Sequence, residues 1–425
     1  MKKTITRWFI AGLVAALAAC GGGLLGNQGR IRLVNATTGL GALDLQINGS
    51  VAISGVAPAT GSDYVLRKAD TYTLDISQTG NAASLLTTTT ALVADKHQTV
   101  VAYNNGGTIG ATILSDEEGD PSKGQAKFRV FNTSSTDSVD VYLITTACST
   151  LASSPLAPTA SGVTGLQSSY AQLASSATTY HLCVTAAGDK TDVRLEIPSF
   201  VLSEKRIVTV ILAPGAGGYL LNAIVLDQQA AVAQALNVSA RARVATSDPT
   251  AVDVTVNGTQ ITSALPAPNV GPYILVPAGP VTVQVNGQAV APVAPLTAAP
   301  GADITVLLTG STPTVTLLPD DNTASTSTAK TVKIRLVNGL NGTTGTATLT
   351  LNNVLVGNGA APASASGYTQ VASSAGLARL EARIGTLQFY FDQTATLESG
   401  RVYSLFLLGD GTTSNPNLGI LIPDR

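Results

Sequence analysis

Four closely related segments, spread along the chain, limit what this sequence can fold into. Each begins with a basic residue, has arginine two positions later and continues with apolar residues; the four begin at Arg30, Lys127, Arg241 and Lys333. Their spacing of roughly 100 residues is too long for a solenoid unit and suits a complete small β-domain. The sequence therefore predicts four tandem domains.

The later parts of the four repeats also correspond. In LDLQING, which begins at Leu43, apolar residues alternate with Asp44 and Gln46, and VDVTVNG from Val252 repeats this pattern. Such alternation predicts strands with one face in a core, and the Asn-Gly pairs predict turns. Each repeat then has a tyrosine before a turn, a long apolar strand and a short strand that ends in aspartate: Tyr64, Tyr170, Tyr273 and Tyr368; Asp116, Asp227, Asp320 and Asp424.

These patterns predict an all-β chain built from tandem β-sandwiches. Charged residues are only 12% of the sequence, about half the usual share, and no helical period follows the N-terminal segment. Segments rich in Ala, Gln, Ser, Thr or acidic residues separate the repeats and are interpreted as linkers. The predicted sandwiches are residues 30–118, 126–228, 239–321 and 331–425. We expect each to have its own core and to fold without the others.

The N-terminus has the pattern of a secretory signal peptide. Lys2, Lys3 and Arg7 precede an apolar run, residues 8–17, that is too short to span a bilayer. The run ends in LAAC, whose last residue is Cys20, and this resembles a bacterial lipobox. In such signals the cysteine thiol receives a diacylglyceryl group and the chain is cut just before it. The alternative is ordinary cleavage after an A-x-A site, with Cys20 incidental.

The lipobox interpretation divides the N-terminus into a signal peptide, residues 1–19, and a lipidated cysteine with a tether, residues 20–29. Acyl chains bury at ~0.8 kcal/mol per CH₂, so a membrane is the expected partner. Gly21 follows the cysteine, which resembles outer-membrane sorting in Gram-negative lipoproteins. The expected location is the cell envelope, as an outer-membrane lipoprotein facing the periplasm or the surface.

Two further cysteines, Cys148 and Cys183, remain in the exported part of the chain. Two thiols in an oxidising compartment most simply pair, so we expect a disulfide within the second sandwich. A metal site would need more ligands, and the only histidines are His97 and His181. No metal or cofactor is therefore predicted.

The opening strand, the VDVxVNG strand and the segment YILVPAG from Tyr273 resemble the bacterial domain-of-unknown-function family 4397. The resemblance is clearest in the third repeat and weakest in the fourth, where Thr348 replaces the aspartate. It implies extracytoplasmic, immunoglobulin-like modules of antiparallel strands on a bacterial envelope protein. It supplies no catalytic residues.

The recurring arginines and aspartates allow two interpretations. Three arginine–aspartate pairs are expected to lie on adjacent strands and to point outward: Arg32 with Asp44, Arg129 with Asp140 and Arg243 with Asp253. They are either a repeated binding surface or cross-strand ion pairs, and we favour ion pairs. The acidic run that contains Asp116, Glu117, Glu118 and Asp120 is interpreted as a solvated linker, with Ca²⁺ binding as the alternative.

Nothing in the sequence predicts catalysis. G-x-S-x-G is absent, neither histidine lies near a nucleophile motif, and the glycine run at Gly215 is interpreted as a turn. The net charge of −2 disfavours nucleic acid as a partner. The sequence favours a non-enzymatic envelope lipoprotein whose modules serve adhesion, scaffolding or binding of a protein or glycan. The alternative is a subunit of an envelope export or surface-fibre assembly, in which an edge strand accepts a partner's strand; an envelope hydrolase is a distant third.

Overall fold

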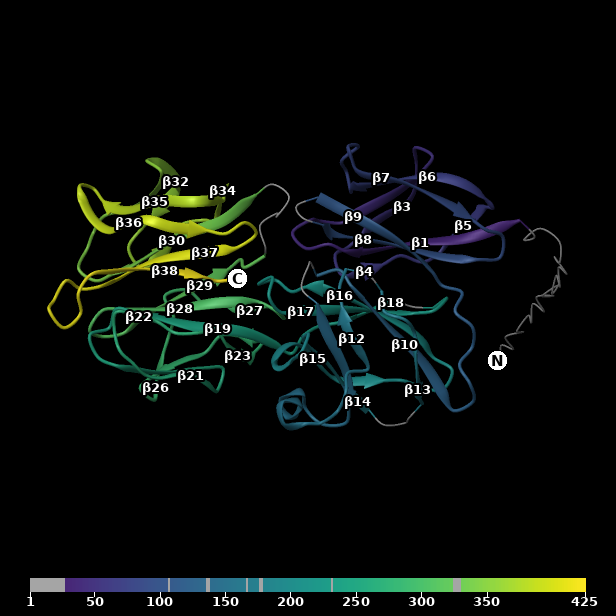
Figure 1. Cartoon of the computed structure of the whole chain (residues 1–425), viewed down its shortest axis with the longest axis horizontal. Helices are drawn as coiled ribbons and strands as arrows, with labels where there is room; N and C mark the ends of the chain where they lie inside the picture. Colours follow the sequence, from purple (N-terminus) through teal and green to yellow (C-terminus); the bar gives the residue numbers. More distant parts are fainter. Residues whose placement is uncertain are drawn as a thin grey trace, which may run out of the picture.

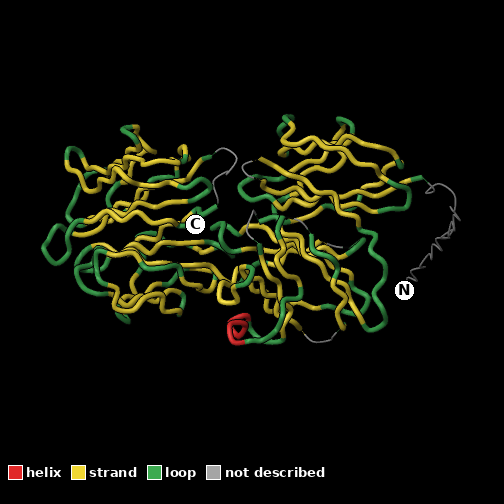
Figure 2. The backbone as a smooth tube through the Cα atoms, in the orientation of Figure 1, coloured by secondary structure: helices red, strands yellow, loops and turns green. Residues whose placement is uncertain are grey.

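The computed structural model describes residues 27–105, 108–134, 138–165, 167–175, 179–230, 232–323 and 330–425. The predicted signal peptide and Cys20 lie outside these residues. The described chain consists almost entirely of strands, arranged as four β-sandwiches, which we call modules 1 to 4 in chain order (Figures 1 and 2). The all-β, tandem-sandwich prediction is therefore confirmed.

Module 1 packs a five-stranded sheet against a four-stranded sheet. The first contains β4 (Thr60–Gly61), β1 (Gln28–Ala36), β8 (His97–Asn105), β9 (Thr108–Ser115) and β5 (Val65–Lys68), which shares one edge of β1 with β4. The second contains, in order, β3 (Ser50–Val56), β2 (Leu43–Ile47), β6 (Asp70–Gln78) and β7 (Ser84–Leu92).

Module 2 repeats this plan with two additions. Its five-stranded sheet contains β13 (Ala171–Ala174), β10 (Gln125–Asn132), β16 (Ile207–Pro214), β17 (Leu221–Asp227) and β18 (Val232–Ala235). Its four-stranded sheet contains β12 (Ala160–Val163), β11 (Val139–Ile144), β14 (Thr179–Ala186) and β15 (Asp189–Val201). The additions are β18, at the edge of β17, and a 3₁₀ helix, η1 (Cys148–Ser153). Since β18 is formed by part of the Ala/Gln-rich segment, the prediction that this whole segment is a linker is wrong.

Modules 3 and 4 have the same two-sheet architecture. The five-stranded sheet of module 3 contains β22 (Asn269–Val270), β19 (Ser239–Thr246), β28 (Asp303–Thr309), β29 (Thr314–Asp320) and β23 (Ile274–Pro277). That of module 4 contains β33 (Ser364–Ala365), β30 (Thr331–Leu340), β37 (Val402–Gly409), β38 (Leu418–Pro423) and β34 (Thr369–Ala372). The four-stranded sheet of module 3 contains β21 (Thr259–Leu265), β20 (Val252–Val256), β25 (Val283–Val285) and β26 (Gln288–Val290). That of module 4 contains β32 (Val354–Ala360), β31 (Ala347–Leu351), β35 (Ser374–Ile384) and β36 (Leu387–Leu397). In module 3, β24 (Gly279–Pro280) also pairs with β27 (Thr297–Ala298).

The strand faces follow the sequence pattern in the four-stranded sheets. In β2, Leu43, Leu45 and Ile47 are buried while Asp44 and Gln46 are half-buried, as alternation predicts. The long apolar strands behave differently: β28 and β37 are buried at every position. Each lies in the middle of its sheet, parallel to the module's first strand. A strand buried on both faces needs a second covering layer beyond its own sandwich core.

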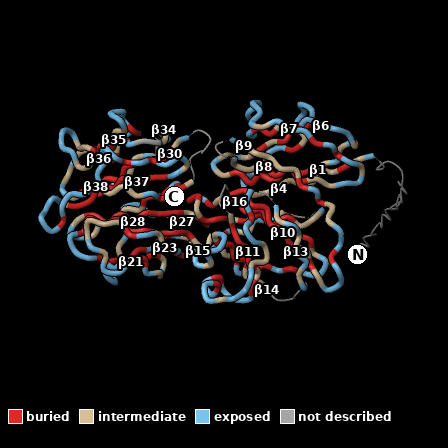
Figure 3. The backbone as a smooth tube through the Cα atoms, viewed as in Figure 1, coloured by how far each residue is buried: buried red, intermediate tan, exposed pale blue. Residues whose placement is uncertain are grey.

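That second layer is the neighbouring module. The five-stranded sheets of modules 1 and 2 face each other, as do those of modules 3 and 4, so that the modules form two pairs (Figure 1). The first interface contains Val34, Val101, Leu114, Phe131, Ile211 and Ile224, and the second contains Ala245, Leu307, Val337, Phe406 and Leu408. Buried residues therefore continue from one module of a pair into the next (Figure 3).

Candidate functional site: buried arginines at the module interfaces

The first strand of each module carries an arginine, two residues after its opening basic residue, on the face that points away from its own sandwich core. These residues are Arg32, Arg129, Arg243 and Arg335, and their exposed fractions are 1%, 6%, 2% and 2%. A charged side chain is rarely buried so completely unless it is paired. The partners of the four guanidinium groups therefore show what this position does.

Within each module the guanidinium group has two recurring contacts. It stacks on the tyrosine of the same repeat at 4.4–4.6 Å from the ring centroid, with the pairs Arg32–Tyr64, Arg129–Tyr170, Arg243–Tyr273 and Arg335–Tyr368. Its Nε donates a hydrogen bond of 2.7–2.9 Å to a hydroxyl on the parallel long strand, from Thr99, Thr209, Thr305 or Ser404. The stacking and the hydrogen bond fix the orientation of the arginine, so that its remaining N–H groups point across the interface.

In the pair formed by modules 3 and 4, those N–H groups meet carboxylates of the other module. Arg243 Nη1 lies 2.5 Å from Asp424 Oδ1, and Arg335 Nη2 lies 2.5 Å from Asp320 Oδ1. Both carboxylates are fully buried. Each module thus supplies one arginine and one aspartate, and the two ion pairs are reciprocal.

The surroundings keep the Asp320 carboxylate charged. Burial acts to raise the pKa of Asp320, but the charges of Arg335 and Arg243 outweigh it, and the pKa lies below its ordinary value. Burial and the nearby Asp320 carboxylate raise the pKa of Tyr273 far above its ordinary value. The Tyr273 hydroxyl therefore stays protonated and donates to Asp320 Oδ2 at 2.5 Å.

The pair formed by modules 1 and 2 keeps the reciprocal geometry with different acceptors. Arg32 Nη1 donates to the carbonyl oxygen of Ala230 at 2.6 Å, and Arg129 Nη2 donates to that of Ser115 at 3.3 Å. The carboxylate of Asp116 stays beside Arg32 of its own module, at 3.5 Å. Asp227 binds Arg206 instead. The arginines of the first pair thus bind carbonyl oxygens across the interface, whereas those of the second pair bind carboxylates.

Modules 2 and 3 meet through the glycine run that the sequence predicts to be a turn. Gly217 donates its N–H to the carbonyl oxygen of Gly301 at 2.9 Å, and a Cβ on Gly215 would lie 2.8 Å from the Cα of Gly301. Only a residue without a side chain permits the close approach of Gly215 to Gly301. Beside this contact, the ring of Tyr219 lies between the guanidinium groups of Arg194 and Arg241, at 3.9 and 3.7 Å. The run is a turn, as predicted, and it also joins the two pairs.

The predicted cross-strand pairs between these arginines and Asp44, Asp140 and Asp253 are wrong. The first and second strands of a module belong to different sheets, so the two side chains lie on opposite surfaces of the sandwich. Asp44 and Asp140 accept hydrogen bonds of 2.8 Å from the N–H groups of Gly55 and Gly162, and Asp253 accepts one of 2.6 Å from Ala264. Each N–H lies where the register of the paired strand shifts. The recurring aspartate therefore accepts a hydrogen bond from a backbone N–H group at a β-bulge of the paired strand.

The acidic run after β9 is divided among separate partners. Asp116 contacts Arg32, Glu117 lies 2.8 Å from His97 Nδ1, and Glu118 lies 2.5 Å from Lys127 Nζ. No group of three or more acidic, histidine or cysteine side chains that could hold a metal ion occurs among the described residues. Asp116, Glu117 and Glu118 therefore each contact a basic side chain, unlike the residues of the predicted solvated linker.

The two cysteines of module 2 lie side by side. Cys148 and Cys183 form a disulfide with their Cα atoms 5.6 Å apart, and it joins η1 to β14. The helix covers the outer face of the four-stranded sheet, where Leu151 packs on Tyr142 and Ile144. Next to it, Glu196 accepts from the Cys148 N–H and lies 3.0 Å from His181 Nδ1. The histidine thus has a structural carboxylate partner.

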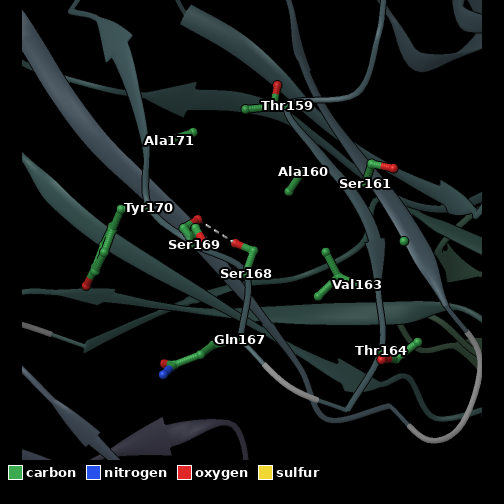
Figure 4. A pocket seen from close by; sticks show the side chains of 11 residues that line it. Thr159, Ala160, Ser161, Val163, Thr164, Gln167, Ser168, Ser169, Tyr170 and Ala171 are labelled. Carbon is green, nitrogen blue, oxygen red and sulfur yellow. Dashed lines mark hydrogen bonds between the residues drawn. The ribbon is translucent and has the colours of Figure 1, made fainter.

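Module 2 also has an open groove of about 430 Å³ between the edges of its two sheets (Figure 4). Its lining is rich in hydroxyl groups and includes Ser161, Thr164, Gln167, Ser168 and Tyr170. Among the described residues that line it, none is an acid, a histidine, a lysine or an arginine. The Tyr170 ring is held against Arg129, so it does not serve as a free stacking surface. The described lining therefore offers hydrogen bonds to a polar ligand.

The sequence pattern of the family described as "Domain of unknown function (DUF4397)" matches residues 29–142 and 240–344, together just over half of the chain. The chain belongs to this family. Each matched region begins within the first strand of a pair's leading module and extends through the first strand of its partner. The DUF4397 match therefore includes both arginine-bearing first strands of each interface.

Other comparisons add little to the DUF4397 assignment. No curated protein sequence matches the chain. Among solved structures it is similar to the Bacillus anthracis TIE protein, with 10% identity over 90% of this chain and 68% of that one, at a TM-score of 0.15. A TM-score this low supports no further argument. Over the described residues, the structure has no helix long and apolar enough to cross a membrane.

Sequence reasoning identified the arginines, tyrosines and final aspartates of the DUF4397 modules but did not bring them together. It missed the hydroxyl partners Thr99, Thr209, Thr305 and Ser404. A signal for them was present, because each long apolar strand has a threonine or serine at the same position, followed directly by a buried aliphatic residue. A polar residue repeated inside a buried strand indicates a buried partner.

Proposed function

We propose that the chain is a non-enzymatic lipoprotein of the bacterial cell envelope whose paired modules form a stiff support for adhesion, scaffolding or ligand binding. The observation that carries the proposal is the reciprocal burial of Arg243 with Asp424 and of Arg335 with Asp320. Such pairs lose much of their favourable energy when the partner module moves away, because a buried charge is then left uncompensated. They favour modules held in one arrangement.

The surfaces left outside this arrangement support display. The five-stranded sheets use the same arginine, tyrosine and hydroxyl in every module, whereas the outer faces of the four-stranded sheets differ. Gln46 and Asp75 lie on that face in module 1, η1 covers it in module 2, and Glu381 beside Phe391 lies on it in module 4. A constant interior with variable outer faces suits a support that carries different contact surfaces. The hydroxyl-lined groove of module 2 is a candidate position for a polar ligand such as a glycan.

Lipid attachment is the first test of the proposal. We expect the mature chain to begin at Cys20 with acyl chains on that residue, because LAAC resembles a lipobox and follows a basic and apolar signal. Mass spectrometry of the purified N-terminus should find the acyl mass, and Cys20→Ala should leave an uncleaved or unanchored protein. An unmodified N-terminus at another residue would contradict lipidation.

The orientation and the alternative assembly role can be tested in the same cells. Protease treatment of intact cells should remove the modules if they face the surface and leave them if they face the periplasm. Crosslinking of envelopes followed by purification distinguishes the two functions: a stoichiometric second protein favours a subunit of an export or fibre assembly. Recovery of this chain without one favours the self-contained support.

A further inference from the structure

One edge of module 1 lacks the protection found at the corresponding edges of the other modules. The last strand of each four-stranded sheet has a free edge, and these strands are β7, β15, β26 and β36. Native proteins protect such edges with charges, proline, bulges or short strands, because a free row of N–H and C=O groups can pair with another chain. The four edges can therefore be compared directly.

Three of the four edges are protected. Strand β15 contains five charged residues from Asp189 to Glu196, followed by Pro198. Strand β26 is only three residues long. Strand β36 contains Asp392, and its pairing with β35 shifts register at three points. Each edge thus has a feature that hinders pairing with a further strand.

Strand β7 has no charge and no proline and is long, and its single register shift lies at its start, between the pairings of Ser84 and Leu86. Its sequence SLLTTTTAL contains no charge and no proline over nine residues. Its pairing with β6 is unbroken from Leu92 to Leu86. The residues Leu85, Thr87, Thr89 and Ala91 are exposed, and threonine is a favourable residue in strands. The neighbouring edge strand β9 is also uncharged, but most of its residues are buried or half-buried. The Ala91 carbonyl accepts a hydrogen bond from Gln98 Nε2 at 3.0 Å, so the regular and accessible part of the edge is its centre, around Thr87, Thr88 and Thr89.

We propose that β7 pairs antiparallel with β7 of a second copy of this chain, forming a two-fold dimer with a continuous eight-stranded sheet. In the central register Thr88 lies opposite Thr88 of the second copy, and Thr87 lies opposite Thr89. Threonine pairs across strands are stabilising, and no like charges meet at the axis because the strand has none. The strand is thus complementary to itself, which specifies the second copy as the occupant.

This pairing closes on itself. The same edge is used by both copies about a two-fold axis, so no free copy of that edge remains. The corresponding edges of modules 2 to 4 are protected, so they do not extend the assembly. The product is a dimer joined at module 1 and not a fibre. The proposal concerns the folded module alone, so it does not depend on lipidation at Cys20 or on the display function.

A single cysteine at the axis tests the proposal in the full chain. Antiparallel residues that are directly opposite and not hydrogen-bonded have Cα atoms about 4.5 Å apart, within disulfide reach. We expect Thr88→Cys, in the oxidising envelope, to give a reducible band of twice the chain mass on non-reducing gels. Gln393→Cys, at an exposed position of the protected edge β36, is the matched control and should stay monomeric.

A charge on the edge provides the second test. Adding Thr89→Lys to the Thr88→Cys chain should lower the crosslinked fraction at least tenfold, because Thr89 is exposed on β7 and lysine protects edges. Gln393→Lys should have no effect. Sedimentation of the purified chain without any added cysteine should give a dimer, and Thr89→Lys should give a monomer, which keeps the test valid if the cysteine variant misfolds.

Three results would overturn the proposal. The first is a monomer at all concentrations, together with an unpaired thiol at the introduced cysteine of the Thr88→Cys chain. The second is a dimer that Thr89→Lys does not weaken. The third is a crosslink from the introduced cysteine to a different protein, which would show that the edge serves a foreign strand.

Discussion

Replacing Arg335 by alanine is expected to destabilise the pair of modules 3 and 4 by about 3–5 kcal/mol, the usual cost of removing one partner of a buried ion pair. Asp320, which is fully buried, would lose the guanidinium group that lies 2.5 Å from it. Urea unfolding of the mature chain should show the loss, and hydrogen exchange should locate it in β29 and β37. The effect should appear in both modules, because the two charges belong to different ones.

An exposed ion pair in the same module is the matched control. Arg401 Nε lies 3.1 Å from Glu398, and both side chains are more than half exposed. Such pairs contribute about 0–1 kcal/mol, so Arg401→Ala should change the unfolding midpoint little. Equal losses from Arg335→Ala and Arg401→Ala would contradict the assigned role of the interface.

The Arg335 effect should also depend on pH. The pKa of Asp320 in the folded protein lies below its ordinary value, so its ionisation contributes stability that is fully present above the ordinary carboxyl pKa. That contribution is lost as the pH falls through the lowered pKa. The difference in stability between the unchanged protein and Arg335→Ala should therefore shrink in acid.

Removing the disulfide of module 2 should produce an effect of similar size. Cys148 and Cys183 are 35 residues apart, and the chain-entropy model gives roughly 4 kcal/mol for closing a loop of that length. Cys148→Ser with Cys183→Ser should lower the stability of module 2 and expose Tyr142 and Ile144 beneath η1. Urea unfolding and hydrogen exchange of β11 and β14 would measure both changes.

The cysteines themselves provide an independent check. In the unreduced chain both thiols should resist alkylation until a reductant is added, because each is bonded to the other and buried. Ready labelling of both residues in the native protein would mean that the disulfide is absent, and the double serine variant should then be as stable as the unchanged chain.

The fold could be predicted from the sequence wherever local pattern determines structure. Alternation placed Leu43, Leu45 and Ile47 in a core, and the repeat of the Arg32 segment indicated four modules. The interfaces were not predicted, because alternation shows that a side chain leaves its own core but does not show what covers it. Alternation predicts that Arg243 points outward, yet its side chain is buried because a second module faces it.

The signal that could have corrected this reading lies in the long apolar strands. In β37 every residue is buried, and Phe406 and Leu408 face the neighbouring module while Leu405 and Leu407 face the sandwich core. A continuous apolar run indicates a strand covered on both faces. The identity of the covering module depends on contacts between residues far apart in the chain, which a repeat pattern does not contain.

The measurement that tests the paired-module account most directly compares two fragments, residues 239–425 and residues 331–425. The sequence predicts that the second folds without its neighbour. The structure leads us to expect otherwise, because separation exposes Val337, Phe406 and Leu408 and leaves Arg335 without Asp320. The longer fragment should be a monomer that unfolds in one cooperative transition at a clearly higher urea concentration, and the shorter one should self-associate or unfold early. A monomeric shorter fragment with the same unfolding midpoint would contradict the account.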